Sequence, residues 1–249
     1  MSNIVYHTNF ERLGVLFSGG VDSTTIIGEV HKTQPETEIY PISFDDNSAN
    51  YRTRRSIAVE QVIGHYQLQQ NHYCIRTYDS EFLRMKGTFG LIPGYKFSMQ
   101  IAAMSYCQSL GIQALAMGYC KENDEYPYTF KDEQVEYLDK IATLFNEIYD
   151  ADIKISLPYI DLNKSNIVSI SWINDVPLEK TISCRSTTFG GLVHCGKCLP
   201  CHSRRVGFKE ASIEDPTIYH FSSEHMEKVE METVGTVVVS PHDRYNKES

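Results

Sequence analysis

Short apolar runs alternate with longer amphipathic stretches over most of the chain. The runs have the length of β-strands, and several of them end at glycine, aspartate or proline. Predicted strands cover Val15–Phe17, Glu38–Phe44, His72–Thr77, Ala114–Met117 and Ile153–Leu157. Residues 1–12 are polar and show no such pattern, so they are predicted to be a short segment leading into the first strand.

Apolar residues recur at helical spacing between the predicted strands. Helices are predicted at Ser23–Val30, Thr53–Gln69, Phe97–Leu110, Asp132–Tyr149 and Lys164–Ile173, the last capped by Asn163 or Asp161. Strands that alternate with helices in this way are typical of an α/β fold, a parallel sheet with helices on both faces. In such a sheet the loops after Phe17, Phe44 and Met117 converge on one crevice, where we place the site.

The segment Ser18-Gly19-Gly20-Val21-Asp22-Ser23 ends the first predicted strand abruptly and opens a helix. Free backbone N–H groups at a helix N-terminus, with the positive end of the helix dipole behind them, bind anions well. Two glycines allow close approach of a phosphate, and Ser18 and Ser23 can add hydroxyl donors. The segment therefore predicts a phosphate site, although a simple glycine turn is the alternative.

Asp22 is the unusual member of this segment. Its carboxylate suits either an N-terminal helix cap or a ligand for the Mg²⁺ that accompanies ATP. The segment lacks the Gly-Lys-Ser/Thr ending of the ordinary nucleotide loop. A strand followed by SGGxDS resembles instead the pyrophosphatase-type loop (PP-loop) of adenylating enzymes, which split ATP between its α and β phosphates.

Four of the seven cysteines follow the spacing C-x10-C-x2-C-x2-C. Four converging thiolates satisfy tetrahedral zinc and leave no open position, which predicts one structural Zn²⁺ per chain. Two disulfides or a redox pair are the alternative, and the flanking His194 and His202 could each replace one cysteine as ligand. Cys107 is predicted to lie in the core and Cys120 at the crevice. The predicted ligands are Cys184, Cys195, Cys198 and Cys201.

Composition limits the partners and the compartment. The 249 residues include 23 basic and 32 acidic side chains, a net charge of −9, which argues against broad nucleic-acid binding and against membrane binding by charge. No apolar run approaches the roughly 20 residues that span a bilayer, and the first residues lack the apolar core of a signal peptide. A cytoplasmic location is expected, with reduced, metal-bound or catalytic cysteines.

Six short motifs occur in a fixed order along residues 13–210. They are SGGxDSTT, ISFD, IPG, G-x7-YP, PxIDLxKxxI, and SC-x10-CGxCxxC followed by R-x-GF. Together they resemble the 7-cyano-7-deazaguanine synthase (QueC) family, whose fold is a Rossmann-like PP-loop domain. The resemblance implies catalytic roles for Asp22 and Ser23, and zinc on the four cysteines. It implies ATP binding at Ser18, Gly19, Gly20, Asp22, Ser23, Thr24 and Phe44, and a deazapurine near Phe44, Pro93, Gly118, Tyr126 and Pro127.

The resemblance also implies the chemistry. ATP with Mg²⁺ adenylates the carboxylate of 7-carboxy-7-deazaguanine, ammonia gives the amide, and a second ATP gives the nitrile. Departures from the family fall on the substrate side, at Asp46-Asn47-Ser48, Tyr95-Lys96 and Tyr128-Thr129-Phe130. The family further implies a homodimer, with residues 1–180 as the nucleotide-binding domain and residues 181–249 as the zinc-binding region and tail.

Three other functions fit parts of the pattern. A QueC-like enzyme of anti-phage defence would deliver the activated deazaguanine to an amine of a protein partner, which Val234–Val239 could help to dock as an edge strand. A PP-loop enzyme acting on tRNA would use a basic patch of Arg185, Lys197, Arg204 and Arg205 around the zinc. A non-catalytic nucleotide-binding or zinc scaffold would not need Asp22 and Ser23 in their positions.

Overall fold

The computed structural model describes residues 2–45, 52–76, 94–121, 134–184 and 190–221. Its centre is a parallel six-stranded sheet with the strand order β1-β6-β5-β2-β3-β4. β2 lies in the middle of the sheet, so the loop that follows it emerges between two neighbouring strands. The strands are β1 Ile4–Val5, β2 Arg12–Leu16, β3 Glu38–Asp45, β4 Tyr73–Arg76, β5 Ala114–Ala116 and β6 Lys154–Ser156.

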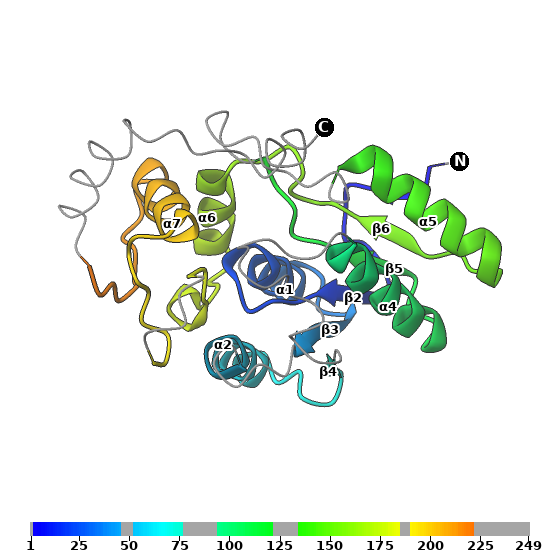
Figure 1. Ribbon diagram of the computed structural model, residues 1–249, viewed down its shortest axis with the longest axis horizontal. Helices are drawn as coiled ribbons and strands as arrows, with labels where there is room; N and C mark the ends of the chain where they lie inside the picture. Colours follow the sequence, from blue (N-terminus) through cyan, green and yellow to red (C-terminus); the bar gives the residue numbers. More distant parts are fainter. Residues whose placement is uncertain (1, 46–51, 77–93, 122–133, 185–189, 222–249) are drawn as a thin grey trace, which may run out of the picture.

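Helices cover both faces of this sheet, as the sequence pattern predicts (Figure 1). α1 and α2 pack on one face, and α4 and α5 pack on the other. α6 lies against α1, and α7 lies against the outer side of α6. The helices are α1 Val21–Thr33, α2 Arg52–His65, α4 Tyr95–Ser109, α5 Val135–Tyr149, α6 Lys164–Ile173 and α7 Leu199–Glu210, with a 3₁₀ turn η2 at Leu178–Lys180.

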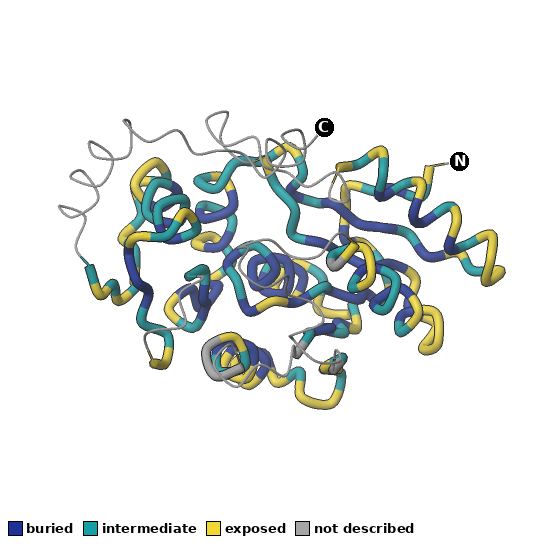
Figure 2. Tube along the Cα trace, viewed as in Figure 1, coloured by how far each residue is buried: buried dark blue, intermediate teal, exposed yellow. Residues whose placement is uncertain are grey.

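The sheet separates two hydrophobic cores, and Figure 2 shows the buried positions running along the strands and the inner sides of the helices. Leu13 and Val15 of β2 point into the core that α1, α2 and α6 cover. Leu115 of β5 and Met104 of α4 belong to the core on the other face. Alternate residues of one strand therefore pack against helices on opposite faces of the sheet, which explains why the central strands are apolar throughout.

Several sequence predictions need correction. Ile4–Val5 is a strand that pairs with Ile155–Ser156 of β6, so the first residues do have a partner. α1 begins at Val21 rather than Ser23, with Gly20 at the N-cap. α7 has no counterpart in the predicted helices. Asn163, rather than Asp161, caps α6, through a capping box in which its side chain accepts from the Asn166 N–H.

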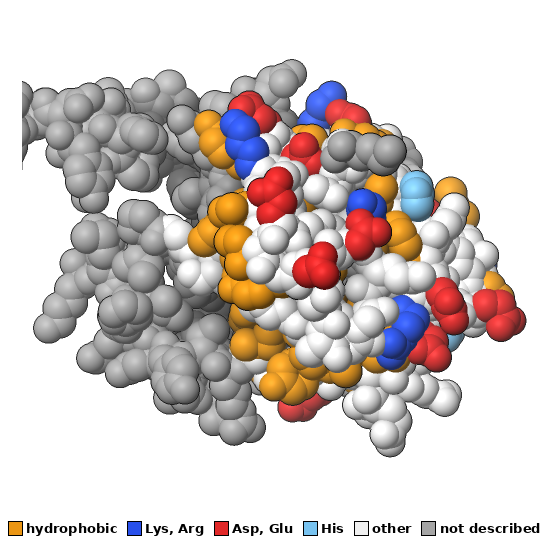
Figure 3. Space-filling view, turned by 90° about the vertical axis from the view of Figure 1, so that its right-hand side faces the viewer, with side chains coloured by type: hydrophobic (Ala, Val, Ile, Leu, Met, Phe, Trp, Pro, Cys, Tyr) orange, Lys and Arg blue, Asp and Glu red, His pale blue; other side chains and the backbone are white. Residues whose placement is uncertain are grey.

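An apolar groove of about 510 Å³ lies between α4 and α5 on the outside of the molecule. Phe97 of α4 and Leu144 and Ile148 of α5 line it and are exposed. Figure 3 shows a band of hydrophobic side chains on this side of the molecule. Within the described residues, no helix combines the length and the apolarity needed to cross a membrane.

Gly14 allows the close approach of α4 to β2, and this contact gives a test of the core. A Cβ atom at position 14 would lie 2.6 Å from the buried Cys107 Sγ. We expect Gly14→Ala to lower the free energy of unfolding by about 1–3 kcal/mol, because overpacking strains a dense core. Urea unfolding monitored by circular dichroism measures this change.

The variant Gly14→Ala/Cys107→Ala supplies the control. Removing the sulfur takes away the atom that the new methyl group meets, so we expect the double variant to be more stable than the sum of the two single changes. Additive losses of stability would contradict this account of the contact.

Candidate active site and metal centre

The predicted phosphate loop lies between the end of β2 and the start of α1. The Phe17 N–H donates to the Ile42 carbonyl of β3 over 2.8 Å, which continues the sheet one residue past β2. Gly19 then adopts a positive φ of 72°, a left-handed conformation that favours glycine. A Cβ at this position would lie 3.0 Å from the Ala58 Cβ of α2. The turn is therefore both left-handed and pressed against α2.

Hydroxyl groups hold the loop together. Ser23 Oγ lies 3.3 Å from the Ser18 backbone nitrogen and 3.4 Å from Ser18 Oγ, so the two serines close the loop from both ends. Thr24 Oγ1 donates to the Gly20 carbonyl over 2.7 Å, and the Thr24 side chain is buried. Thr24 therefore supports the loop from the protein interior, whereas Ser18 is exposed to solvent.

The N-terminus of α1 presents backbone donors beside these hydroxyls. The first N–H groups of an α-helix have no acceptor within the helix, and the N-cap here is a glycine whose position offers no side-chain cap. The helix dipole adds positive potential at the same place. Asp22 lies in the first turn of α1 rather than at the cap position, so the interpretation of Asp22 as the N-cap is wrong.

Lys164 is the partner of Asp22. Its Nζ donates to Asp22 Oδ1 in an ion pair that joins α6 to α1, and the two side chains are 19% and 28% exposed. Burial by itself would lower the pKa of Lys164. The Asp22 carboxylate and the neighbouring Cys120 together raise the pKa by more than burial lowers it, so the pKa of Lys164 lies above its ordinary value. The ammonium group therefore stays charged at neutral pH.

β5 supplies the opposite wall. A Cβ at Gly118 would lie 3.0 Å from the Asp22 Cβ and from the Ser23 backbone nitrogen, so the chain after β5 touches the start of α1. The predicted convergence of the loops after Phe17 and Met117 is thus present. Phe44, the last residue but one of β3, is half-buried and packs against the core under α4. The other predicted substrate residues, Pro93, Tyr126 and Pro127, lie outside the described residues, as does the segment Val234–Val239.

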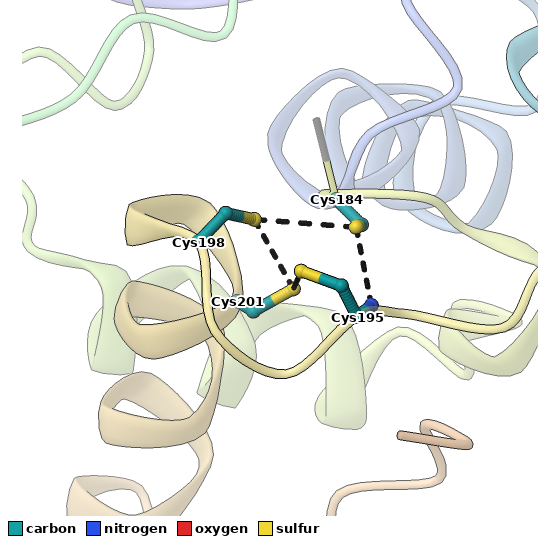
Figure 4. A group of neighbouring side chains, drawn as sticks. All are labelled: Cys184, Cys195, Cys198 and Cys201. Carbon is teal, nitrogen blue, oxygen red and sulfur yellow. Dashed lines mark hydrogen bonds between the residues drawn. The ribbon is translucent and has the colours of Figure 1, made fainter. Parts of the chain in front are cut away.

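The four predicted metal ligands form one cluster (Figure 4). All four sulfur atoms of Cys184, Cys195, Cys198 and Cys201 lie within 4.8 Å of one another. Three of their separations are 3.4, 3.9 and 4.0 Å. A tetrahedral zinc ion with Zn–S bonds of about 2.3 Å needs sulfur atoms about 3.8 Å apart. The donor set therefore fits a single tetrahedral ion.

Two other features agree with one compact ion. In a [4Fe–4S] cluster each thiolate binds a different iron, which holds the sulfurs farther apart than around a single ion. Backbone N–H groups also point at the sulfurs, from Cys195 to Cys184 Sγ over 3.2 Å and from Lys197 to Cys195 Sγ over 3.4 Å. Such donors stabilise thiolates and orient them toward a metal.

His194 is not a fifth candidate ligand. Its Nε2 accepts from the Ser183 N–H over 3.0 Å, and its Nδ1 lies 3.0 Å from the Leu192 carbonyl. Both ring nitrogens are therefore engaged with the backbone, and the suggestion that His194 replaces a cysteine is wrong. The buried imidazole ties the segment before Cys184 to the segment before Cys195.

The metal centre is connected directly to the phosphate loop. The Ile182 N–H, two residues before Cys184, donates to the Gly19 carbonyl over 2.9 Å. Arg204 of α7 holds the same segment, because its guanidinium donates to Thr181 Oγ1 over 2.7 Å and to the Leu178 carbonyl over 2.8 Å. Its side chain is 1% exposed. Arg204 is therefore not part of a basic surface patch around the cysteines, as the tRNA alternative requires, but a buried residue that holds the segment before Ile182 in place.

Sequence reasoning missed the roles of Lys164 and Arg204. Both lie in or beside motifs that were visible, Lys164 in PxIDLxKxxI and Arg204 directly before R-x-GF. For Lys164, a basic residue within the motif PxIDLxKxxI was the sequence signal that could have indicated a functional role. Only the structure shows that one faces Asp22 and that the other is buried.

Comparisons with known proteins agree with the motifs. The family model described as "Queuosine biosynthesis protein QueC" matches residues 13–212. The 7-cyano-7-deazaguanine synthase of Methanobrevibacter smithii is 33% identical over 129 residues, which cover 52% of this chain and 54% of that protein. 7-Cyano-7-deazaguanine synthase 2 of Desulfitobacterium hafniense is 28% identical over 222 residues, with 82% of this chain and 91% of that protein covered.

One solved structure is similar at a lower level. The U34-tRNA thiolase NcsA from Methanococcus maripaludis, determined with its [4Fe-4S] cluster, has a TM-score of 0.46 and 12% sequence identity, covering 95% of this chain and 84% of that chain. A likeness at this level says nothing about the activity or the metal of the present protein.

The family model includes β2, the phosphate loop, the Lys164 segment, all four cysteines and α7. The resemblance that the motifs predict is confirmed over most of the chain. The chain belongs to the QueC family.

Proposed function

We propose that this protein is an ATP-dependent ligase that adenylates the carboxylate of 7-carboxy-7-deazaguanine and couples it to an amine. One observation carries the proposal: in a chain of the QueC family, the SGGxDS loop and the α1 N-terminus stand at the carboxyl edge of a parallel sheet, between β5 and α6. This is where an open α/β sheet binds its ligands.

The proposed reaction begins at the α-phosphate of ATP. A carboxylate oxygen forms a bond to the α-phosphorus, and the bond to the bridging oxygen breaks as pyrophosphate leaves. The N–H groups at the start of α1, with Ser18 and Ser23, suit the phosphate oxygens, and Asp22 suits the Mg²⁺. Ammonia then attacks the acyl-adenylate, and AMP and a proton leave. A second ATP transfers its adenylyl group to the amide oxygen with loss of pyrophosphate, and elimination of AMP and a proton gives the nitrile. Positioning of two anions is the main demand on the protein.

The deazapurine is proposed to bind beside the loop. Gly118 follows β5 and Phe44 lies near the carboxyl end of β3, at the same edge of the sheet. Pro93, Tyr126 and Pro127 are assigned to this pocket by the family motifs. The amine that accepts the acyl group is ammonia in this proposal. A protein amine is the alternative, and the assay below separates the two.

The metal is proposed to be one structural Zn²⁺. Four thiolates leave no open coordination position, so the ion supplies folding energy and no bound water for catalysis. Because Ile182 and Cys184 are neighbours in the chain, the ion would also hold the segment that contacts Gly19. Residues 181–249 are proposed as a zinc-binding region attached to a nucleotide-binding domain of residues 1–180.

The activity is tested by incubating the purified protein with Mg²⁺, ATP and 7-carboxy-7-deazaguanine, with and without ammonium, and following AMP, pyrophosphate and the base by mass spectrometry. We expect AMP and pyrophosphate to depend on the acid, and the nitrile to appear with ammonium. Accumulation of the adenylate alone would support the activation step and point to another acceptor, whereas accumulation of the amide would show that ammonia is accepted and that the nitrile step does not follow. Absence of acid-dependent pyrophosphate release would contradict the proposal.

Asp22→Asn tests the loop within the same assay. The amide keeps the size of the side chain and an acceptor for Lys164 but loses the charge that binds Mg²⁺. We expect the rate of pyrophosphate release to fall about a hundredfold or more, because weaker Mg²⁺ binding leaves the negative charge of the phosphates in the transition state less well stabilised. The control is Asp152→Asn, an exposed carboxylate paired with Lys154 just before β6. Full activity of Asp22→Asn would rule out its role.

Cys198→Ser tests the metal. We expect the wild-type chain to carry one zinc and no iron by elemental analysis, and Cys198→Ser to lose the zinc and most of the soluble protein, because structural zinc binding is worth about 10–16 kcal/mol in small zinc domains. Cys74→Ser is the control, since Cys74 is exposed on β4 away from the cluster. Unchanged thermal stability after complete removal of the metal would exclude the structural role.

A further inference from the structure

The peptide group between Gly19 and Gly20 faces two parts of the molecule at once. Its carbonyl accepts from the Ile182 N–H over 2.9 Å. Because C=O and N–H point in opposite directions in a planar trans peptide, this bond directs the Gly20 N–H away from Ile182. The Gly20 N–H donates to Ser18 Oγ over 3.3 Å, and Ser18 is exposed to solvent. The Gly20 N–H therefore faces the side of the loop from which a phosphate can approach.

The two glycines make this orientation depend on a partner outside the loop. Glycine adopts positive and negative φ about equally well, so a peptide between two glycines turns over at little cost. Thr24 Oγ1 fixes the peptide after Gly20 by donating to its carbonyl over 2.7 Å. The peptide before Gly20 is fixed by Ile182, which belongs to a distant part of the chain. The direction of one candidate phosphate donor is therefore set by the position of Ile182.

Ile182 faces both glycines through its backbone. A Cβ atom at Gly20 would lie 3.7 Å from the Ile182 carbonyl oxygen, so this carbonyl lies beside the loop as the N–H does. The Ile182 side chain is buried. The preceding residue, Thr181, is extended, with φ −97° and ψ 154°, and connects Ile182 to the 3₁₀ turn η2. The position of η2 therefore decides where the Ile182 N–H lies.

Arg204 holds this turn at both of its ends. One terminal nitrogen of its guanidinium donates to Thr181 Oγ1 over 2.7 Å, and the other donates to the Leu178 carbonyl over 2.8 Å. The side chain is 1% exposed, and burial lowers the pKa of Arg204 from its ordinary value. A buried cation costs stability, and an apolar side chain would avoid that cost. A planar fork of donors, however, grips two acceptors in a fixed geometry, which an apolar side chain cannot do.

We infer that Arg204 is a positioning residue for the phosphate loop. It holds η2, this turn places the Ile182 N–H, and that N–H keeps the Gly20 N–H directed at a phosphate oxygen of the ligand. The inference rests on the proposed function, because the ligand is the phosphate chain of ATP or the pyrophosphate that leaves. The guanidinium, engaged with Thr181 and Leu178, acts on the ligand through the backbone and transfers no proton.

Ile182→Pro tests the hydrogen bond itself. Proline has no N–H to donate to Gly19, and the extended conformation of Thr181 is one that residues before proline adopt. We expect this variant to bind pyrophosphate with Mg²⁺ about tenfold more weakly than wild type in isothermal titration calorimetry, since a hydrogen bond to a charged ligand is lost. Ile182→Val keeps the N–H, shortens the side chain by one carbon and should bind like wild type.

Arg204→Met tests the positioning role. Methionine fills the buried space but removes both donors to the turn. We expect pyrophosphate binding to weaken about as much as in Ile182→Pro, and the Ile182 amide hydrogen to exchange faster in NMR-detected hydrogen exchange. The double variant Arg204→Met/Ile182→Pro should bind no more weakly than Ile182→Pro alone, because both changes break the same connection.

Arg205→Met is the matched control. Arg205 is the next residue of α7, and its guanidinium also donates to backbone carbonyls, those of Gly196 over 3.2 Å and Phe221 over 2.6 Å. This variant therefore loses the same kind of contact at a different segment. We expect Arg205→Met to bind pyrophosphate like wild type. Elemental analysis and circular dichroism of each variant show whether the metal and the fold are retained.

The outcomes separate the inference from the proposed function. Unchanged pyrophosphate binding by a folded Arg204→Met overturns the inference, and so do losses that add in the double variant. If Arg204→Met is unfolded or loses its metal, Arg204→Lys replaces it, because lysine keeps the charge but not the fork. Weaker pyrophosphate binding and faster exchange at Ile182 then support the inference, and wild-type values overturn it. A wild-type protein that binds neither ATP nor pyrophosphate overturns the proposed function itself, whereas exchange at Ile182 in the Arg204 variants still reports on the turn.

Discussion

The backbone hydrogen bond from Ile182 to Gly19 links the two chemical parts of this protein. On one side of it is a left-handed glycine in the phosphate loop, and on the other is a segment that reaches the cysteine cluster two residues later. Neither segment has regular secondary structure of its own at this point. Each depends on the other for one backbone partner, and a loop whose carbonyl is fixed in this way keeps its orientation toward a ligand. The cysteine cluster is therefore tied to the architecture of the predicted phosphate loop.

α7 extends the same connection. Its N-terminal turn carries Cys201, its middle carries Arg204, and its next turn carries Gly207. These three residues face the metal cluster, the segment before Ile182 and the stem of Lys164, respectively. One helix therefore contacts the cysteine cluster, the segment before Ile182 and Lys164. The two terminal nitrogens of the buried Arg204 guanidinium donate to hydroxyl and carbonyl acceptors, and its Nε lies 3.6 Å from Asp215 Oδ1 without a hydrogen bond, so the charge is held by fixed partners rather than by water.

Local pattern predicted the central sheet and its main helices, because each strand and helix there is long enough to show its own period. It also predicted the loop between β2 and α1 and pointed to the four cysteines that the structure brings together, since such motifs require particular residues at short spacing. β1 could not be found in this way: Ile4–Val5 is a strand only because β6 offers an unpaired edge. α7 is largely polar and is stabilised by packing on α6, so its local signal is weak. The ion pair of Asp22 and Lys164 joins residues 142 positions apart and leaves no trace in any local window.

Close backbone approach, more than side-chain contact, sets the shape of the site. Gly118 brings the chain after β5 against Asp22, and Gly207 brings α7 against Lys164, at distances that admit no additional carbon. These contacts hold the first turns of α1 and α6 beside the candidate site, where Asp22 and Lys164 form their ion pair.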